Sequence, residues 1–170
     1  MTEKAIEKLN KKHLLIIGGT NVQRQKLIDE IIKGSNYEFF RFPKQMRTID
    51  DYIDFVRKEK LYQPWYSKKG KFGTNQVLDF HRDWISENNS LVVMEEFQEM
   101  EQIWKMDLLK SYIDQIMNRK KGEKTIRLIV SQENENGLME NLSNVFYGNE
   151  KDQRTPEQII KGSIELVEIK

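Results

Sequence analysis

Three short groups of residues are of the types that bind phosphate or assist chemistry at a metal ion. The first is Gly18-Gly19, which follows a short apolar run and precedes a helical pattern. A glycine turn between a strand and a helix N-terminus binds phosphate, because free backbone N–H groups and the helix dipole both attract anions. The acidic pair Glu95-Glu96 and the polar pair Ser131-Gln132 each follow another apolar run. Two carboxylates at a strand end predict chemistry linked to a metal ion.

The glycine turn and the acidic pair also have purely structural interpretations. Thr20 and Gln23 have the spacing of a capping box, which would satisfy the first N–H groups of the helix without any phosphate. Glu95 and Glu96 stand shortly before another helical pattern, where acids stabilise a helix through its dipole. The sequence alone leaves both interpretations open.

The elements that must position these groups alternate between strands and helices. Short apolar runs typical of buried parallel strands occupy residues 13–17, 37–42, 91–94 and 126–130. An alternating pattern at 164–169 predicts a fifth, less buried strand near the sheet edge. Helical patterns occupy residues 1–11, 20–33, 76–87, 101–120 and 138–146, and further helices start at the caps Thr48 and Thr155.

This order predicts an α/β three-layer sandwich, in which helices flank a mostly parallel five-stranded sheet. In the second helix the expected apolar stripe is Val22, Leu27, Ile28, Ile31 and Ile32, and Gly34 is expected as the residue just past its end. Ligands bind beyond the carboxyl ends of the strands in such sheets. The three groups all lie at such ends, so we expect the ligand site there.

Composition limits the classes of protein to consider. The 170 residues predict one domain, with a helical extension at 1–12 and a long loop at 61–75. A net charge of +1 excludes a protein held to nucleic acid by its bulk charge. The absence of cysteine excludes disulfides, thiolate zinc sites and cysteine nucleophiles. We expect no signal peptide and no membrane span, and we expect a cytoplasmic location.

The element order and these groups resemble a P-loop NTPase of the additional-strand division, which contains the AAA+ ATPases. Glu95-Glu96 after LVVM looks like the Walker B motif, and EEFQ looks like the DEFQ of related ATPases. The resemblance implies ATP and Mg²⁺ as cofactors, with Glu95 holding the metal ion through water and Glu96 polarising the attacking water. It also places Ser131 and Gln132 where that family has its polar sensor.

The phosphate loop departs from the family pattern, G-x-x-x-x-G-K-[ST]. Aligned on Gly18, the chain reads GGTNVQRQ, so Gln23 replaces the second glycine, Arg24 the lysine and Gln25 the hydroxyl residue. Arg24 keeps the positive charge, but as a broad planar fork. This degenerate Walker A motif argues against efficient ATP hydrolysis. The resemblance implies these nucleotide-binding positions: Gly18, Gly19, Thr20, Asn21, Gln23, Arg24, Gln25 and Lys26.

The loop at 61–75 is a second candidate site, because it mixes aromatic and basic residues. The candidates for partner contact are Trp65, Tyr66, Lys68, Lys69 and Lys71. Aromatic rings stack on bases while lysines neutralise phosphates, which is the mixture used for single-stranded nucleic acid. Exposed aromatics also form protein contacts. In a third interpretation, the aromatic rings cover the sheet and the lysines are only solvated.

The remaining titratable residues give weaker signals. His13 and His81 have no neighbour at ligand spacing, so no metal site is expected at either. Arg127 and Arg154 resemble arginine fingers by family analogy alone. A position inside a strand argues against Arg127, and Arg154 would require an oligomer.

Two functions are compatible with these observations. The first is an AAA+-like ATPase domain with a degraded phosphate loop and no helical lid, which has a regulatory or assembly role and weak or absent ATP hydrolysis. The alternative is a non-catalytic scaffold of the same fold, which binds a protein or nucleic-acid partner through the 61–75 loop. A doubly wound enzyme of another class is a third, less supported reading.

Overall fold

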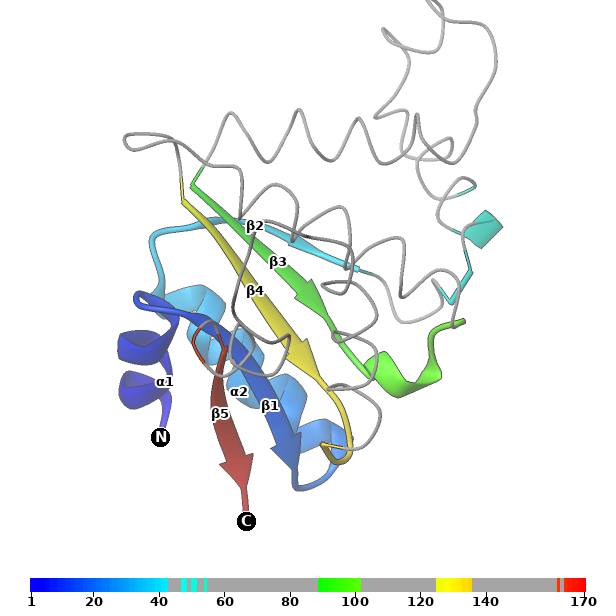
Figure 1. The fold of residues 1–170 in the computed structure, drawn as a ribbon, viewed down its shortest axis with the longest axis horizontal. Coiled ribbons are helices and arrows are strands. Elements are labelled where there is room, and N and C mark those ends of the chain that lie inside the picture. The colour runs from blue at the N-terminus through cyan, green and yellow to red at the C-terminus, as the bar shows by residue number, and fades with distance from the viewer. Residues whose placement is uncertain are drawn as a thin grey trace, which may run out of the picture.

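The computed structural model describes residues 1–42, 47–48, 50–51, 54, 89–101, 125–135, 162 and 164–170. They form a five-stranded sheet with two helices packed on one face (Figure 1). The elements are α1 (Thr2–Leu9), β1 (His13–Gly18), α2 (Asn21–Gly34), β2 (Glu38–Arg41), β3 (Ser90–Met94), the 3₁₀ turn η1 (Phe97–Glu99), β4 (Ile126–Ser131) and β5 (Ile164–Ile169). The predicted parallel five-stranded α/β sheet is confirmed. The helices expected at 76–87, 101–120 and 138–146, and the loop at 61–75, lie outside the described residues.

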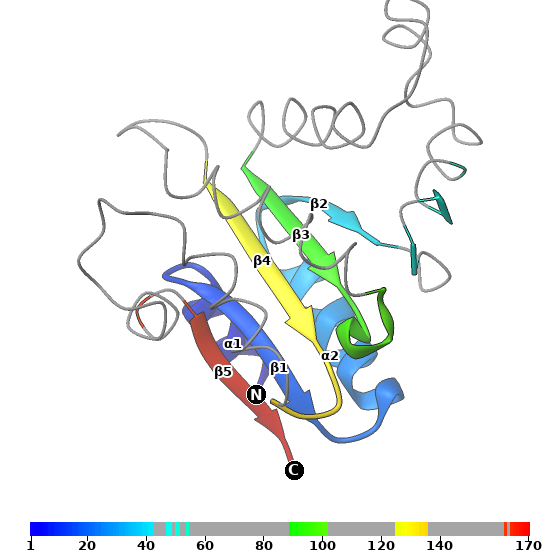
Figure 2. The ribbon, with the colours of Figure 1, turned by 45° about the vertical axis from the view of Figure 1, so that its right-hand side comes forward.

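The order of the strands in the sheet is β2-β3-β4-β1-β5, and every neighbouring pair is parallel. Strand β4 therefore lies between β1 and β3, although it follows both in the chain (Figure 2). Ser131 pairs with Ile16 of β1, and Val130 pairs with Met94 of β3. This register brings the carboxyl ends of β1, β4 and β3 together at one edge of the sheet.

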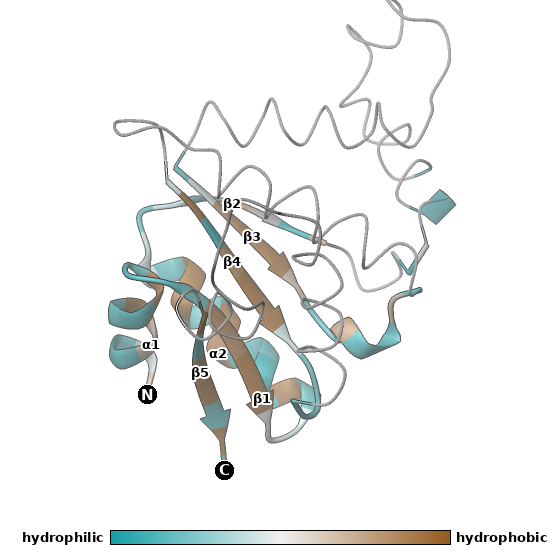
Figure 3. Cartoon of the chain, viewed as in Figure 1, coloured by the Kyte–Doolittle hydropathy of each residue, from teal (hydrophilic) through white to brown (hydrophobic). Residues whose placement is uncertain are grey.

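The core lies between the sheet and the two helices. One face of the strands is apolar at alternate positions, as period-two side-chain placement requires, and Figure 3 shows the strands as the most hydrophobic part of the fold. The buried residues of the core come from this face of the sheet and from both helices: Ala5, Leu9, Leu14, Ile16, Leu27, Ile28, Ile31, Leu91, Val93, Ile129, Val167 and Ile169. The N-terminal helix α1 is thus part of the core.

The predicted stripe of α2 is correct for Leu27, Ile28 and Ile31, which are buried. Val22 is different, since it is 73% exposed in the first turn, where the helix has just left the end of β1. Gly34 is the last residue of α2, and the cap is Ser35. A Cβ atom on Gly34 would lie 2.7 Å from Ile6 Cδ1, so this glycine allows α1 to approach α2 closely.

The two edge strands of the sheet are β5, as the sequence predicts, and β2. β5 is an edge strand, in which Val167 and Ile169 are buried while Leu166 and Glu168 are exposed. β2 is shorter than expected, with four residues, and forms the opposite edge. No helix among the described residues combines the length and the apolar character needed to cross a membrane.

Candidate functional site

The turn after β1 is short and depends on its glycines. Only Gly19 and Thr20 separate β1 from α2. Gly18 and Gly19 have φ of 75° and 58°, in the left-handed region that favours glycine. A Cβ atom on Gly18 would also lie 2.4 Å from the backbone oxygen of Ile169 in β5. The chain therefore reverses direction against β5 in a space that excludes other side chains.

The first turn of α2 is capped by the chain itself, as the capping-box spacing predicts. Thr20 Oγ1 accepts a hydrogen bond from Gln23 N at 3.2 Å, and Gln23 Oε1 accepts one from Thr20 N at 2.7 Å. Two N–H groups that would face a phosphate are thus bound to side chains. These contacts support the purely structural interpretation of this turn, in which Thr20 and Gln23 cap the helix.

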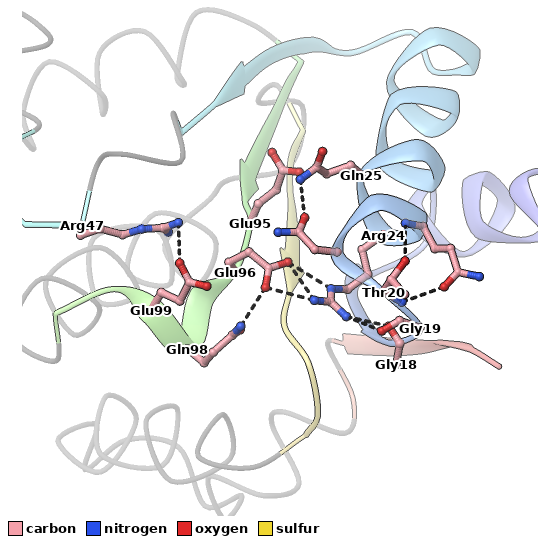
Figure 4. Close-up of polar contacts among 12 residues, drawn as sticks. Gly18, Gly19, Thr20, Arg24, Gln25, Arg47, Glu95, Glu96, Gln98 and Glu99 are labelled. Carbon is pink, nitrogen blue, oxygen red and sulfur yellow. Dashed lines mark hydrogen bonds and ion pairs between the residues drawn. The ribbon is translucent and has the colours of Figure 1, made fainter.

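Arg24 fills the space between this turn and β3 (Figure 4). Arg24 is buried, with 3% of its surface exposed. Nη1 donates to the carbonyl oxygens of Gly18 at 2.8 Å and Gly19 at 2.9 Å. Nε and Nη2 donate to the Glu96 carboxylate at 3.0 to 3.1 Å. All three nitrogens of the guanidinium are therefore hydrogen-bonded within the chain.

The Glu96 carboxylate also has several hydrogen-bond partners, and the backbone of Glu96 has an unusual φ. Its carboxylate, also buried, accepts a further hydrogen bond from Gln98 Nε2 at 2.8 Å. Among the described residues it is the non-glycine residue with positive φ, at 48°. The left-handed conformation costs about 1–2 kcal/mol for a residue with a Cβ atom. With this backbone conformation the Glu96 carboxylate reaches Arg24 of α2, while Glu95 contacts Arg41 of β2.

Glu95 is held by a second arginine, which the sequence did not single out. Arg41 of β2 donates to Glu95 Oε1 through Nη2 at 2.9 Å and to Oε2 through Nε at 2.5 Å. Arg41 also donates to Asp29 of α2. The hydrogen bond that Arg41 donates to Glu95 is the largest cause that raises the pKa of Arg41, and the one it donates to Asp29 adds to it, so this guanidinium stays charged. Each member of the acidic pair therefore has its own arginine.

The predicted sensor residues lie at the same edge. Ser131 is fully buried, and its Oγ is the buried side-chain polar atom without a hydrogen-bond partner among the described residues. Gln132 is also buried, and its Nε2 donates to Asn134 O at 2.5 Å. The structure brings both beside the glycine turn, since Gln132 N donates to Ile16 O at 3.1 Å. Their sensor role stays a prediction.

The other candidate residues are less involved in this site. Gln25 donates to Asn21 within the first turns of α2, and Lys26 is exposed. Arg127 donates to the carbonyl oxygens of Leu9 at 2.7 Å and Asn10 at 3.0 Å, which is a C-terminal cap on α1. The candidates Trp65, Tyr66, Lys68, Lys69, Lys71, His81 and Arg154 lie outside the described residues.

His13 is a buried structural histidine in the described part of the chain. Its Nδ1 accepts a hydrogen bond from Leu128 N at 3.1 Å. Burial, assisted by the positive charge of Arg127, lowers the pKa of His13 to about 4. The imidazole is therefore neutral at pH 7 and joins β1 to β4.

A pocket of about 260 Å³ lies at the opposite edge of the sheet, near the amino ends of the strands. Its lining residues are Ile6, Asn10, Gly34, Ser35, Asn36, Tyr37, Asn89 and Thr125. None of the predicted site residues contributes to it. The cluster at the carboxyl ends of β1, β3 and β4 is accordingly the candidate site.

The side chains as placed do not fit a nucleotide with its magnesium ion. All three guanidinium nitrogens of Arg24 are bound within the chain, and Arg41 contacts both oxygens of Glu95, the residue expected to hold the metal ion through water. Mg²⁺ prefers carboxylate and water oxygens in open octahedral geometry. Among the described residues, no group of three or more acidic, histidine or cysteine side chains is arranged to hold a metal ion.

Comparisons with known proteins define the fold. No protein-family model matches the sequence, and no curated protein gives a significant match. The crystal structure of Cdc6p from Pyrobaculum aerophilum, an AAA+ ATPase, aligns with a TM-score of 0.55 at 13% sequence identity. The alignment covers 96% of this chain and 44% of that chain, so this chain spans less than half of its length. At this identity the similarity shows an α/β, P-loop NTPase-like fold and nothing finer.

Proposed function

We propose that this chain is an AAA+-like domain that has a regulatory or assembly role and does not hydrolyse ATP efficiently. The observation that carries the proposal is the buried ion pair between Arg24 and Glu96. Phosphoryl transfer needs a positive charge on the phosphates and a group that positions the attacking water. In this chain the two residues at those positions neutralise each other.

The energetics of the pair support this proposal. Both side chains are 4% exposed, and Nη2 lies 3.0 Å from Oε1. Breaking a buried ion pair costs about 3–5 kcal/mol, since one charge loses its partner in a poorly solvated site. A nucleotide that engaged Arg24 would first have to offset this loss. The self-capped start of α2 adds to the barrier, because the cap already uses N–H groups that anchor phosphates in this fold.

A thermal-shift titration of the wild type with Mg-ATP and Mg-ADP tests the proposal, together with an assay of phosphate release. We expect no saturable shift beyond that of MgCl₂ at millimolar nucleotide, and no phosphate release above that of buffer. Arg24→Ala and Glu95→Ala serve as reference variants. Saturable stabilisation and turnover by the wild type, both lost in Arg24→Ala, would overturn it.

The scaffold function is the second candidate, and the same ion pair favours it. A fold whose charged site is satisfied internally needs no nucleotide to complete it. The proposed contact surface for a protein or nucleic-acid partner is the 61–75 segment, supported by its aromatic and lysine residues. Replacing Trp65 and Tyr66 by alanine should abolish partner binding in a pulldown or a single-strand binding assay. Unchanged binding would remove this segment from the proposal.

A further inference from the structure

Glu96 contacts Arg24 in the way that a bound oxyanion contacts an arginine. Nε and Nη2 of Arg24 form a fork on both carboxylate oxygens, at 3.0 to 3.1 Å. Gln98 adds a third nitrogen donor, at 2.8 Å from Oε2. Figure 4 shows the three nitrogen atoms converging on this one carboxylate. Forked arginine contacts of this kind are those that recognise carboxylate and phosphate groups.

We propose that Arg24 and Gln98 form an oxyanion socket, which the Glu96 carboxylate closes as a tethered internal ligand. Removing that carboxylate opens the socket to inorganic phosphate. The inference rests on the proposed function, because it explains how the turn is closed without a ligand. It goes further by assigning a ligand class to Arg24 and an autoinhibitory role to Glu96.

The arginine is positioned independently of Glu96. Its Nη1 is fixed by the carbonyl oxygens of Gly18 and Gly19, at 2.8 and 2.9 Å. These contacts hold the guanidinium from the β1 side and leave Nε and Nη2 directed at β3. The fork therefore keeps its orientation when Glu96 is shortened, as a preformed binding site requires.

Among the described residues of the site, no other acid is free to replace Glu96. Glu95 is the nearest in the chain, and both of its oxygens accept from Arg41. Arg24 without Glu96 would be a buried charge without a partner, which is strongly unfavourable. A dissolved oxyanion that entered the socket would remove this penalty, so its binding would stabilise the fold.

Glu96→Gly is the variant best suited to the test. It deletes the carboxylate, and glycine suits the φ of 48° at this position. We expect this variant to melt below the wild type in chloride. Sodium phosphate at matched ionic strength should then raise its melting temperature saturably by several degrees, and leave the wild type unchanged. Acetate is the second probe, and we expect a larger response to phosphate, because phosphate carries more negative charge and offers more acceptor oxygens to Arg24 and Gln98.

Two further variants serve as controls. Arg24→Met combined with Glu96→Gly should lose the phosphate response. Glu99→Gln changes an exposed acid of the same segment, whose partner is Arg47 at 2.8 Å, and should show no response. A folded Glu96→Gly that ignores phosphate would overturn the inference, as would a response that survives loss of Arg24 or a response to acetate that equals or exceeds the response to phosphate.

If Glu96→Gly does not fold, Glu96→Gln replaces it, because it keeps the volume and removes the charge. Phosphate should stabilise Glu96→Gln weakly but saturably, and no response in this variant counts against the inference. These outcomes are separate from those of the proposed function. ATP hydrolysis by the wild type would overturn the proposed function, whereas the socket is tested only with phosphate and acetate on the variants.

Discussion

The guanidinium of Arg24 and the carboxylate of Glu96 are 72 residues apart in the chain and form a buried, forked ion pair. The pair joins the first turns of α2 to Glu96, the second residue after β3. Through Gly18 and Gly19 it also reaches the end of β1. Three segments that are distant in the sequence are therefore tied together by one side chain.

Removing one member of this pair should destabilise the fold strongly. Arg24→Met leaves the buried Glu96 carboxylate without its partner, and we expect a loss of about 3–5 kcal/mol in the free energy of unfolding. Adding Glu96→Gln should recover part of that loss, because neither charge of this pair then remains. Urea denaturation of the two single variants and the double variant measures the coupling energy. Strictly additive effects would show that the two side chains do not interact in solution.

The stability of the protein should depend on His13 between pH 4 and pH 6.5. The folded state lowers the pKa of His13 from 6.5 to about 4, so in this window the unfolded chain binds the extra proton. The contribution of the neutral imidazole is fully present above pH 6.5. It is lost as the pH falls towards 4, by an amount on the order of 3 kcal/mol.

Urea denaturation at pH 7.0 and pH 4.5 measures this effect. In His13→Gln the side chain still offers an oxygen to Leu128 N but does not titrate in this range. The difference in stability between the two pH values should be smaller in this variant than in the wild type. An equal difference in both proteins would assign the pH dependence to other groups.

Ser131→Ala should be neutral or should stabilise the fold by about 1 kcal/mol. The hydroxyl is fully buried and has no hydrogen-bond partner among the described residues, so burying it is unfavourable. Ser90 is equally buried and has partners, so Ser90→Ala is the matched control and should destabilise. Thermal melting compares the two variants. A clear loss of stability in Ser131→Ala would mean that this hydroxyl is bound in solution.

Gly18→Ala should be among the most damaging small substitutions in the chain. It introduces a Cβ atom at a φ of 75° and places it 2.4 Å from a backbone oxygen of β5, which cannot rotate away. We expect a loss of about 2 kcal/mol or more. Gly34→Ala is the comparison, since its clash is with the flexible end of Ile6, at 2.7 Å. Equal melting temperatures for the two variants would contradict this reasoning.

The strands and the start of α2 could be predicted because their signals are local. Four apolar runs and one alternating pattern located the five strands to within one residue at each end, and the spacing of Thr20 and Gln23 predicted the cap. The partners of the acidic pair could not be found in this way. Arg41 stands in a strand like many surface arginines, and only the pairing of β2 with β3 brings it to Glu95.

The conformation of Glu96 had no sequence signal either. Left-handed backbone is usually marked by glycine or asparagine, and here an ion pair to α2 holds a glutamate in it. Because of this ion pair, Arg24 and Glu96 contact each other, whereas the family resemblance implies that Arg24 binds phosphate and Glu96 polarises water. Motif alignment predicts where residues lie in a fold. Whether two opposite charges at those positions bind a ligand or each other depends on the distance between them in three dimensions.

The position of β1 has a consequence for how the chain folds. β1 is synthesised before the other four strands of the sheet, yet it pairs only with β4 and β5, as His13 with Ile164 illustrates. The glycine turn is likewise closed against the last strand, through Gly18 and Ile169. Contacts of such long sequence separation form slowly, because a long loop must close first. A growing chain on the ribosome therefore leaves β1 without its partners in this sheet until β4 emerges, and completes the candidate site only when β5 is made.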